Sequence, residues 1–236
     1  MLTGQGAPGA ETHEAQATTH KTAQTTTKVN VVNRPLDVLL TAEDGVNLQA
    51  THYPGTGRSV LLVHMLNSRR QSYDVFAGQL SSDFAVLSID LRGHGGSDLD
   101  WKSFSDDDFR AMVLDVKAGV EFLRGQGYEE IILVGASIGA NSVLNYAAED
   151  PTINSVVLLS PGMDYRGISI EEGMLSYSRR LLVVASESDE YSFSTAEQIM
   201  QMSMADKVFM PLNGSAHGTD MLDGSLMKKI VTWIKA

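Results

Sequence analysis

The chain of 236 residues contains no cysteine. This absence excludes disulfide bonds, metal sites built on thiolates and a cysteine nucleophile. It assigns no compartment, because a chain without thiols is compatible with any redox environment. Any chemistry must therefore rest on hydroxyl, imidazole and carboxylate side chains.

Positive charge is also scarce. Lysine and arginine together number 18 against 29 aspartates and glutamates, which gives a formal net charge of −11 at pH 7. Such a chain repels the phosphates of nucleic acids and the head groups of anionic lipids. We expect neither as a partner.

Long apolar runs are missing as well. No run approaches the roughly 20 residues that a membrane-spanning helix needs, and the N-terminus lacks the apolar core of a signal peptide. We therefore expect a soluble chain without a membrane span.

Large apolar side chains are almost absent from residues 1–28, which are rich in threonine, alanine, glycine and glutamine. A segment of this kind cannot offset its ordering entropy by burial, so we predict a flexible tail over 1–28. A tether left after removal of an export or lipoprotein signal would have the same composition, and a native gene without an upstream signal would contradict that hypothesis. Residues 29–236 are predicted to form a single domain.

From residue 29 on, short β-rich runs alternate with longer amphipathic ones. PLDVLLTAEDGVNLQATHY predicts an antiparallel hairpin with a turn at Asp44-Gly45. Continuous apolar strands are predicted at SVLLVH, FAVLSID, IILVGAS, VVLLSPG, LLVVASESD and KVFMPL, and helices near 73–80, 106–124, 141–150 and 221–234. The alternation predicts an α/β fold with a mostly parallel sheet of about eight strands and helices on both faces. In such sheets the ligand crevice lies at the carboxyl ends of the strands.

One of these strand ends carries the sequence GASIG, which fits the pattern GxSxG around Ser137. A sharp turn from strand to helix strains the serine backbone and crowds its neighbours, so the glycines supply space. The N–H of Ile138 lacks an intrahelical partner at the start of the helix and can donate to a developing oxyanion. Because a serine hydroxyl is a poor nucleophile alone, the motif needs partners elsewhere in the chain.

The motif stands in a wider series: LLVHM, DLRGHGGSD, GASIG, LLSPG, VVASESDEYS and SAHGTD, in this order. The series resembles the α/β-hydrolase superfamily from the third predicted strand to the C-terminus. It is most similar to the compact carboxylesterase and dienelactone-hydrolase-like branch, which has no large cap. The short segment Met163–Leu181 has no room for a large lid.

The resemblance implies a catalytic triad in the order nucleophile, acid, histidine. Ser137 is then the nucleophile and His217, in GSAHGTD, its base. Asp189, at the end of a predicted strand, is the expected acid that holds His217 in the correct tautomer. The alternatives for the acid are Asp164, Glu187 and Glu190.

The resemblance also implies a second oxyanion donor after the third predicted strand. Many relatives carry a His-Gly dipeptide there, whereas this chain has His64-Met65. A backbone N–H is present whatever the side chain, so Met65 and Ile138 are the predicted oxyanion pair. We interpret His64 as a residue that hydrogen-bonds the loop, with a second base as the alternative. Met65, Leu66, Met163 and Met174 are candidates for an acyl pocket.

The implied function is that of a serine carboxylesterase acting on short to medium acyl esters, without a metal or an organic cofactor. A thioesterase, a lactonase and a dienelactone-hydrolase-like enzyme would use the same triad. A binding module on the same fold is the alternative outside enzymes. A dehalogenase is disfavoured, because position 137 holds serine instead of aspartate.

Overall fold

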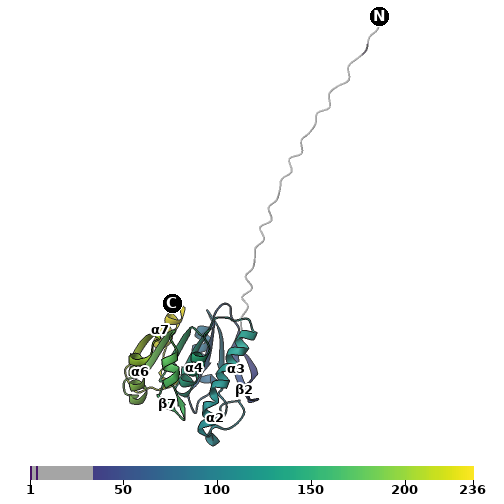
Figure 1. Ribbon diagram of the computed structural model, residues 1–236. Coiled ribbons are helices and arrows are strands. Elements are labelled where there is room, and N and C mark those ends of the chain that lie inside the picture. Colours follow the sequence, from purple (N-terminus) through teal and green to yellow (C-terminus); the bar gives the residue numbers. More distant parts are fainter. Residues whose placement is uncertain (2–3, 5–33) are drawn as a thin grey trace. The chain divides into compact units, whose positions relative to one another are not determined.

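The computed structural model describes Met1, Gly4 and residues 34–236 (Figure 1). The predicted tail over 1–28 and the predicted start of the domain at residue 29 lie outside these residues. Both therefore stay predictions.

An eight-stranded sheet forms the centre of the fold, in the order β1-β2-β4-β3-β5-β6-β9-β10. The β1–β2 and β2–β4 pairs are antiparallel, and all other pairs are parallel. The strands are β1 Leu36–Thr41, β2 Asn47–Tyr53, β3 Ser59–Val63, β4 Ala85–Ile89, β5 Ile131–Ala136, β6 Ser155–Leu159, β9 Arg180–Ser186 and β10 Asp206–Leu212. The predicted mostly parallel sheet with an antiparallel N-terminal hairpin is confirmed.

Helices cover both faces of this sheet. One core lies between the sheet and α3, α4, α5 and α6, and a second lies between the sheet and α1 and α7 (Figure 1). The helices are α1 Asp74–Leu80, α2 Asp106–Arg110, α3 Met112–Gly125, α4 Ile138–Glu149, α5 Glu171–Ser176, α6 Glu190–Met202 and α7 Gly224–Lys235. Short 3₁₀ segments are η1 Arg70–Tyr73, η2 Trp101–Ser103 and η3 Gly218–Met221. Strands β3 to β6 are buried along their whole length because both faces are covered.

Three segments differ from the sequence-based expectation. The helix predicted over 106–124 is divided at Ala111, where ψ of −8° tightens the turn and separates α2 from α3. The last helix begins only at Gly224, because the carboxylate of Asp223 accepts the N–H groups of Ser225 and Leu226. The segment before β9 folds into a small hairpin of β7 Asp164–Tyr165 and β8 Ile168–Ser169, followed by α5.

None of the helices in the described part of the chain combines the length and the apolar character needed to cross a membrane.

Candidate active site

Ser137 lies at the turn between β5 and α4, with φ of 51° and ψ of −117°. Its N–H donates to the carbonyl of Leu159 at 2.8 Å, which fixes this strained backbone to the neighbouring strand. A Cβ at Gly135 would lie 2.3 Å from the carbonyl oxygen of Gly139, and one at Gly139 would lie 2.5 Å from that of Val63. Glycine is required at both positions because the backbones approach so closely.

Asp189 and His217 lie at the carboxyl ends of the strands, as Ser137 does. Asp189 follows β9 and precedes α6, and its Oδ2 is 2.7 Å from Nδ1 of His217. When Nδ1 donates this hydrogen bond, Nε2 of His217 is left with a lone pair that can accept a proton. Ser137 and His217 line the same cavity, so the structure brings together the three residues predicted for the triad.

Within the described residues, the alternative acids form no hydrogen bond or ion pair with His217. Asp164 is exposed, and its Oδ1 accepts the N–H of Gly167 at 2.8 Å. Glu187 and Glu190 are exposed beside Asp189. Among these carboxylates, Asp189 alone has the hydrogen bond that orients the imidazole.

Two buried serines hold the backbone on either side of His217. The hydroxyl of Ser160, at the end of β6, accepts the N–H of Gly218 at 2.9 Å. The hydroxyl of Ser186, at the end of β9, donates to the carbonyl of Ala216 at 2.6 Å. Their roles were not predicted, although both are polar residues that end a buried apolar run.

The loop after β3 is held by two buried histidines. Nε2 of His64 accepts the N–H of Leu91 at 3.0 Å, so Nδ1 carries the proton and donates to the carbonyl of Met65 at 2.7 Å. Nε2 of His94 likewise accepts the N–H of Asn67 at 3.2 Å. Burial lowers the pKa of His64 to about 4 and also lowers the pKa of His94, so both rings remain neutral acceptors near pH 7.

The predicted oxyanion donors, Met65 and Ile138, both line the cavity beside Ser137. Ile138 is the first residue of α4, where an N–H has no intrahelical acceptor. The hydrogen bonds of His64 fix the peptide that follows Met65. The arrangement fits two N–H donors near the serine, and their role stays a prediction.

The cavity has a volume of about 290 Å³. It is lined by Met65, Leu66, Ser137, Ile138, Asp164, Tyr165, Arg166 and His217. Two of the four predicted acyl-pocket residues, Met65 and Leu66, thus line it, whereas Met163 and Met174 pack in the hydrophobic core. The ring of Tyr165 stands edge-on to His217, with 6.3 Å between centroids, and was not foreseen from the sequence.

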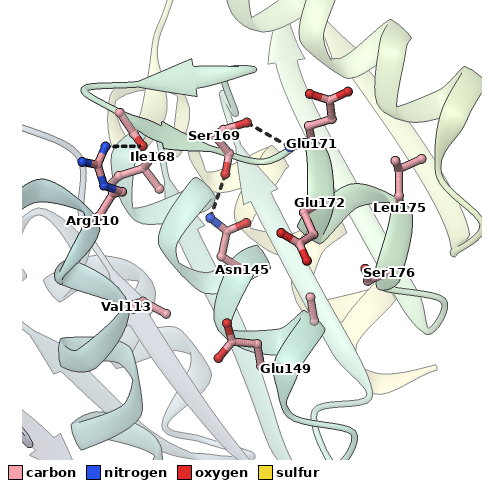
Figure 2. Close-up of a pocket in the computed structure, with 13 residues that line it drawn as sticks. Arg110, Val113, Asn145, Glu149, Ile168, Ser169, Glu171, Glu172, Leu175 and Ser176 are labelled. Carbon is pink, nitrogen blue, oxygen red and sulfur yellow. Dashed lines mark hydrogen bonds between the residues drawn. The ribbon is translucent and has the colours of Figure 1, made fainter. Parts of the chain in front are cut away.

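A larger cavity of about 880 Å³ lies on the other side of the β7–β8 hairpin (Figure 2). Its walls come from α2, α3, α4 and α5, and they carry Arg110 and the acidic side chains Glu149, Glu171 and Glu172. No residue predicted for the triad or the oxyanion hole lines it. The candidate active site is therefore the smaller cavity.

Comparison with curated proteins finds partial matches. The chain is 30% identical over 109 residues to the AB hydrolase superfamily protein YisY of Bacillus subtilis. The aligned region covers 45% of this chain and 38% of that protein. It is 24% identical over 191 residues to epoxide hydrolase 3 of Xenopus tropicalis, which covers 76% of this chain and 48% of that protein. The chain thus spans less than half the length of these relatives.

Solved structures match over most of the chain. An esterase from Pyrococcus furiosus superposes with a TM-score of 0.70 at 19% identity and covers 86% of this chain and 90% of its own. Est1E from Butyrivibrio proteoclasticus, solved with ferulic acid bound, gives a TM-score of 0.71 at 17% identity, with 84% of this chain and 98% of its own covered. These similarities confirm the predicted α/β-hydrolase fold.

The sequence model of one protein family matches residues 56–209, which is more than half of the chain. This range includes Ser137 and Asp189 and ends before His217. The chain therefore belongs to the α/β-hydrolase family Hydrolase_4, which is described as "Serine aminopeptidase, S33".

Proposed function

We propose that the protein is a serine carboxylesterase that hydrolyses short to medium acyl esters through an acyl-enzyme. One observation carries the proposal: Ser137 and His217 share a cavity, while Oδ2 of Asp189 lies 2.7 Å from Nδ1 of His217. A serine, a histidine and an aspartate in this order are the groups that together activate a serine hydroxyl.

In the acylation step, Oγ of Ser137 attacks the ester carbonyl while Nε2 of His217 takes the hydroxyl proton. Asp189 stabilises the imidazolium that forms. The carbonyl oxygen becomes an oxyanion, which the N–H groups of Met65 and Ile138 stabilise in the proposed mechanism.

The tetrahedral intermediate then collapses. The bond to the leaving alcohol breaks, and His217 gives its proton to the departing oxygen. In deacylation His217 takes a proton from a water molecule, which attacks the acyl carbon and releases the acid. Ser137 recovers its proton, so the cycle is balanced without a further reactant.

The size of the cavity supports a small substrate. Its volume of about 290 Å³ is at the lower end of the range for small-molecule sites. The segment before β9 contributes only a short hairpin and α5 instead of a large cap. The structural similarity to two proteins named as esterases supports the proposed esterase activity.

The proposal is tested with p-nitrophenyl esters of increasing acyl length. We expect hydrolysis of acetate and butyrate, decreasing with long acyl chains, and a loss of roughly 10⁴-fold or more in turnover for Ser137→Ala. A fluorophosphonate probe should label Ser137 in the native chain.

Ser59→Ala is the matched control, because Ser59 begins β3, at the end of the strands away from Ser137. Its buried hydroxyl has no hydrogen-bond partner within the described residues. The variant should keep both activity and labelling. Near-full esterase activity in a folded Ser137→Ala variant would contradict the assignment.

A further inference from the structure

The β7–β8 hairpin forms one wall of the candidate active site, and its two-residue turn consists of Arg166 and Gly167. Both have positive φ, 56° and 81°. Turns of this kind favour asparagine or glycine at the first position, so arginine there adopts a strained backbone. Strain of this kind at a cavity points to a function for the side chain.

The hairpin is firmly anchored. The hydroxyl of Tyr191 accepts the N–H of Asp164 and donates to its carbonyl, both at 2.9 Å. The amide of Asn141 donates to the carbonyl of Ile168 at 2.8 Å. On the side of the larger cavity, the guanidinium of Arg110 donates to the carbonyl of Gly167 in the turn (Figure 2). Arg166 therefore projects from a fixed position.

The guanidinium of Arg166 is not paired with a carboxylate within residues 34–236. Its guanidinium forms no ion pair or hydrogen bond there, and it lies over the ring of Phe109 at 5.9 Å from the centroid. Of the nearby acids, Asp107 is paired with Arg110, Asp164 accepts the N–H of Gly167, and Asp106 packs against the turn at Gly167. Arg166 nevertheless lines the cavity that contains Ser137.

The cationic side chain of Arg166 contrasts with the negative net charge of the whole chain. The net charge of −11 repels anions, so an anionic substrate needs a local positive group to bind. A guanidinium suits this task, because its planar donors can bind a carboxylate through two parallel hydrogen bonds. Among the residues that line the cavity, Arg166 is the arginine and Asp164, which accepts the N–H of Gly167, is the carboxylate.

We propose that Arg166 is a substrate-binding residue that holds a carboxylate, and that the preferred esters carry a carboxylate on their acyl or alcohol part. This inference rests on the proposed esterase function and names its substrate class. The carboxylate is bound and takes no part in the bond changes at Ser137.

Two pairs of substrates test it. On the acyl side, the mono-4-nitrophenyl ester of adipate is compared with 4-nitrophenyl hexanoate, which has a methyl group in place of the carboxylate. On the alcohol side, 4-acetoxybenzoate is compared with phenyl acetate. In each pair the measured quantity is the ratio of kcat/KM for the anionic ester to kcat/KM for the neutral one.

We expect Arg166→Gln to lower this ratio about tenfold in at least one pair, mainly through KM. Arg166→Lys should restore part of the ratio. High salt should lower the ratio of the native enzyme more than that of Arg166→Gln, because salt screens the exposed charge. Arg166→Asn provides a second variant, since asparagine tolerates the positive φ of this turn.

Lys228→Gln on the exposed face of α7 is the matched control, because it removes one positive charge from a residue that does not line the cavity. It should leave the ratio unchanged. If Arg166→Gln and Arg166→Asn leave both ratios as in the native enzyme, the assignment of Arg166 is overturned while the esterase proposal stands. If the folded native chain hydrolyses none of the four esters and resists a fluorophosphonate, the proposed function itself fails.

Discussion

At the scale of single residues, backbone strain collects around the candidate site. Four of the five non-glycine residues with positive φ in the described part of the chain lie in its loops: Asn67, Ser137, Ser160 and Arg166. Such conformations cost about 1 kcal/mol or more each and persist only where the surroundings hold them. The hydrogen bond from the Ser160 N–H to the carbonyl of Val184, at 2.8 Å, is one such constraint. The surrounding hydrogen bonds thus hold these loops in strained backbone conformations at the candidate site.

Ser160 provides a prediction at this scale. Replacing it with alanine leaves the buried N–H of Gly218 without its acceptor and frees the loop that carries His217. We expect Ser160→Ala to cost roughly 1–3 kcal/mol of unfolding free energy. We also expect kcat to fall about tenfold or more, because small displacements of a catalytic base are costly.

Urea unfolding and steady-state kinetics measure the two effects. Ser59→Ala is again the control, since it removes a buried serine hydroxyl that has no partner in the part of the chain that the structure describes. It should leave kcat unchanged. A Ser160→Ala variant that loses stability but keeps kcat would show that the hydroxyl does not position His217.

The residues of the predicted triad could be placed from the sequence because each directly follows a recognisable strand or motif. Tyr165 and Arg166 could not, because they reach the cavity through a hairpin whose strands have two residues each. Ser160 acts on Gly218 across 58 positions of the chain, a contact that no local pattern encodes. The roles of side chains that act through tertiary contacts therefore could not be predicted from a single sequence.

At the scale of elements, continuous apolar runs predicted the strands well because both faces of the sheet are buried. The helix boundaries were less predictable. The division between α2 and α3 depends on one residue, Ala111, which has high helix propensity and gives no signal of a break. The segment 163–181 lacks a long periodic pattern, so its hairpin is fixed by tertiary hydrogen bonds from Asn141 and Tyr191.

The hairpin provides the prediction for this scale. Tyr191→Phe removes both hydrogen bonds to Asp164 and should loosen the wall that carries Tyr165 and Arg166. We expect KM for p-nitrophenyl butyrate to rise a few-fold, with a loss of about 1 kcal/mol in unfolding free energy.

Tyr128→Phe is a closely matched control for this change. The hydroxyl of Tyr128 also pairs with the backbone of a single residue, since it accepts the N–H of Gly55 and donates to its carbonyl. Both residues lie before β3 and β5, at the end of the strands away from the candidate active site. The variant should cost a similar amount of stability and leave KM unchanged. Equal KM effects in the two variants would mean that the hairpin does not shape the cavity.

At the scale of the whole molecule, stability depends on pH through buried groups. His64 is fully buried, and its Nε2 must be unprotonated to accept the N–H of Leu91. Burial lowers its pKa to about 4 from a reference value of 6.5, so the unfolded chain binds more protons between these values. The contribution of neutral His64 is therefore complete above about pH 6.5 and is lost as the pH falls towards 4.

Neighbouring groups modify this dependence. His94 opposes protonation of His64, whereas Asp90 favours it. Burial raises the pKa of Asp115 to about 6, which acts in the opposite direction, because the folded state then binds the extra proton. Only a comparison of variants that share Asp115 isolates the contribution of His64.

His64→Gln makes this comparison, because the glutamine amide offers one acceptor and one donor at the same place and does not titrate. Between pH 7 and pH 4.5 the native chain should lose about 2 to 3 kcal/mol more unfolding free energy than the variant, as one pKa unit corresponds to about 1.4 kcal/mol. Urea unfolding curves at the two pH values measure the difference. The native chain loses this free energy because its unfolded form binds a proton on the imidazole at pH 4.5, while the folded ring stays largely neutral. If both chains lose the same free energy on acidification, buried His64 does not couple the fold to pH.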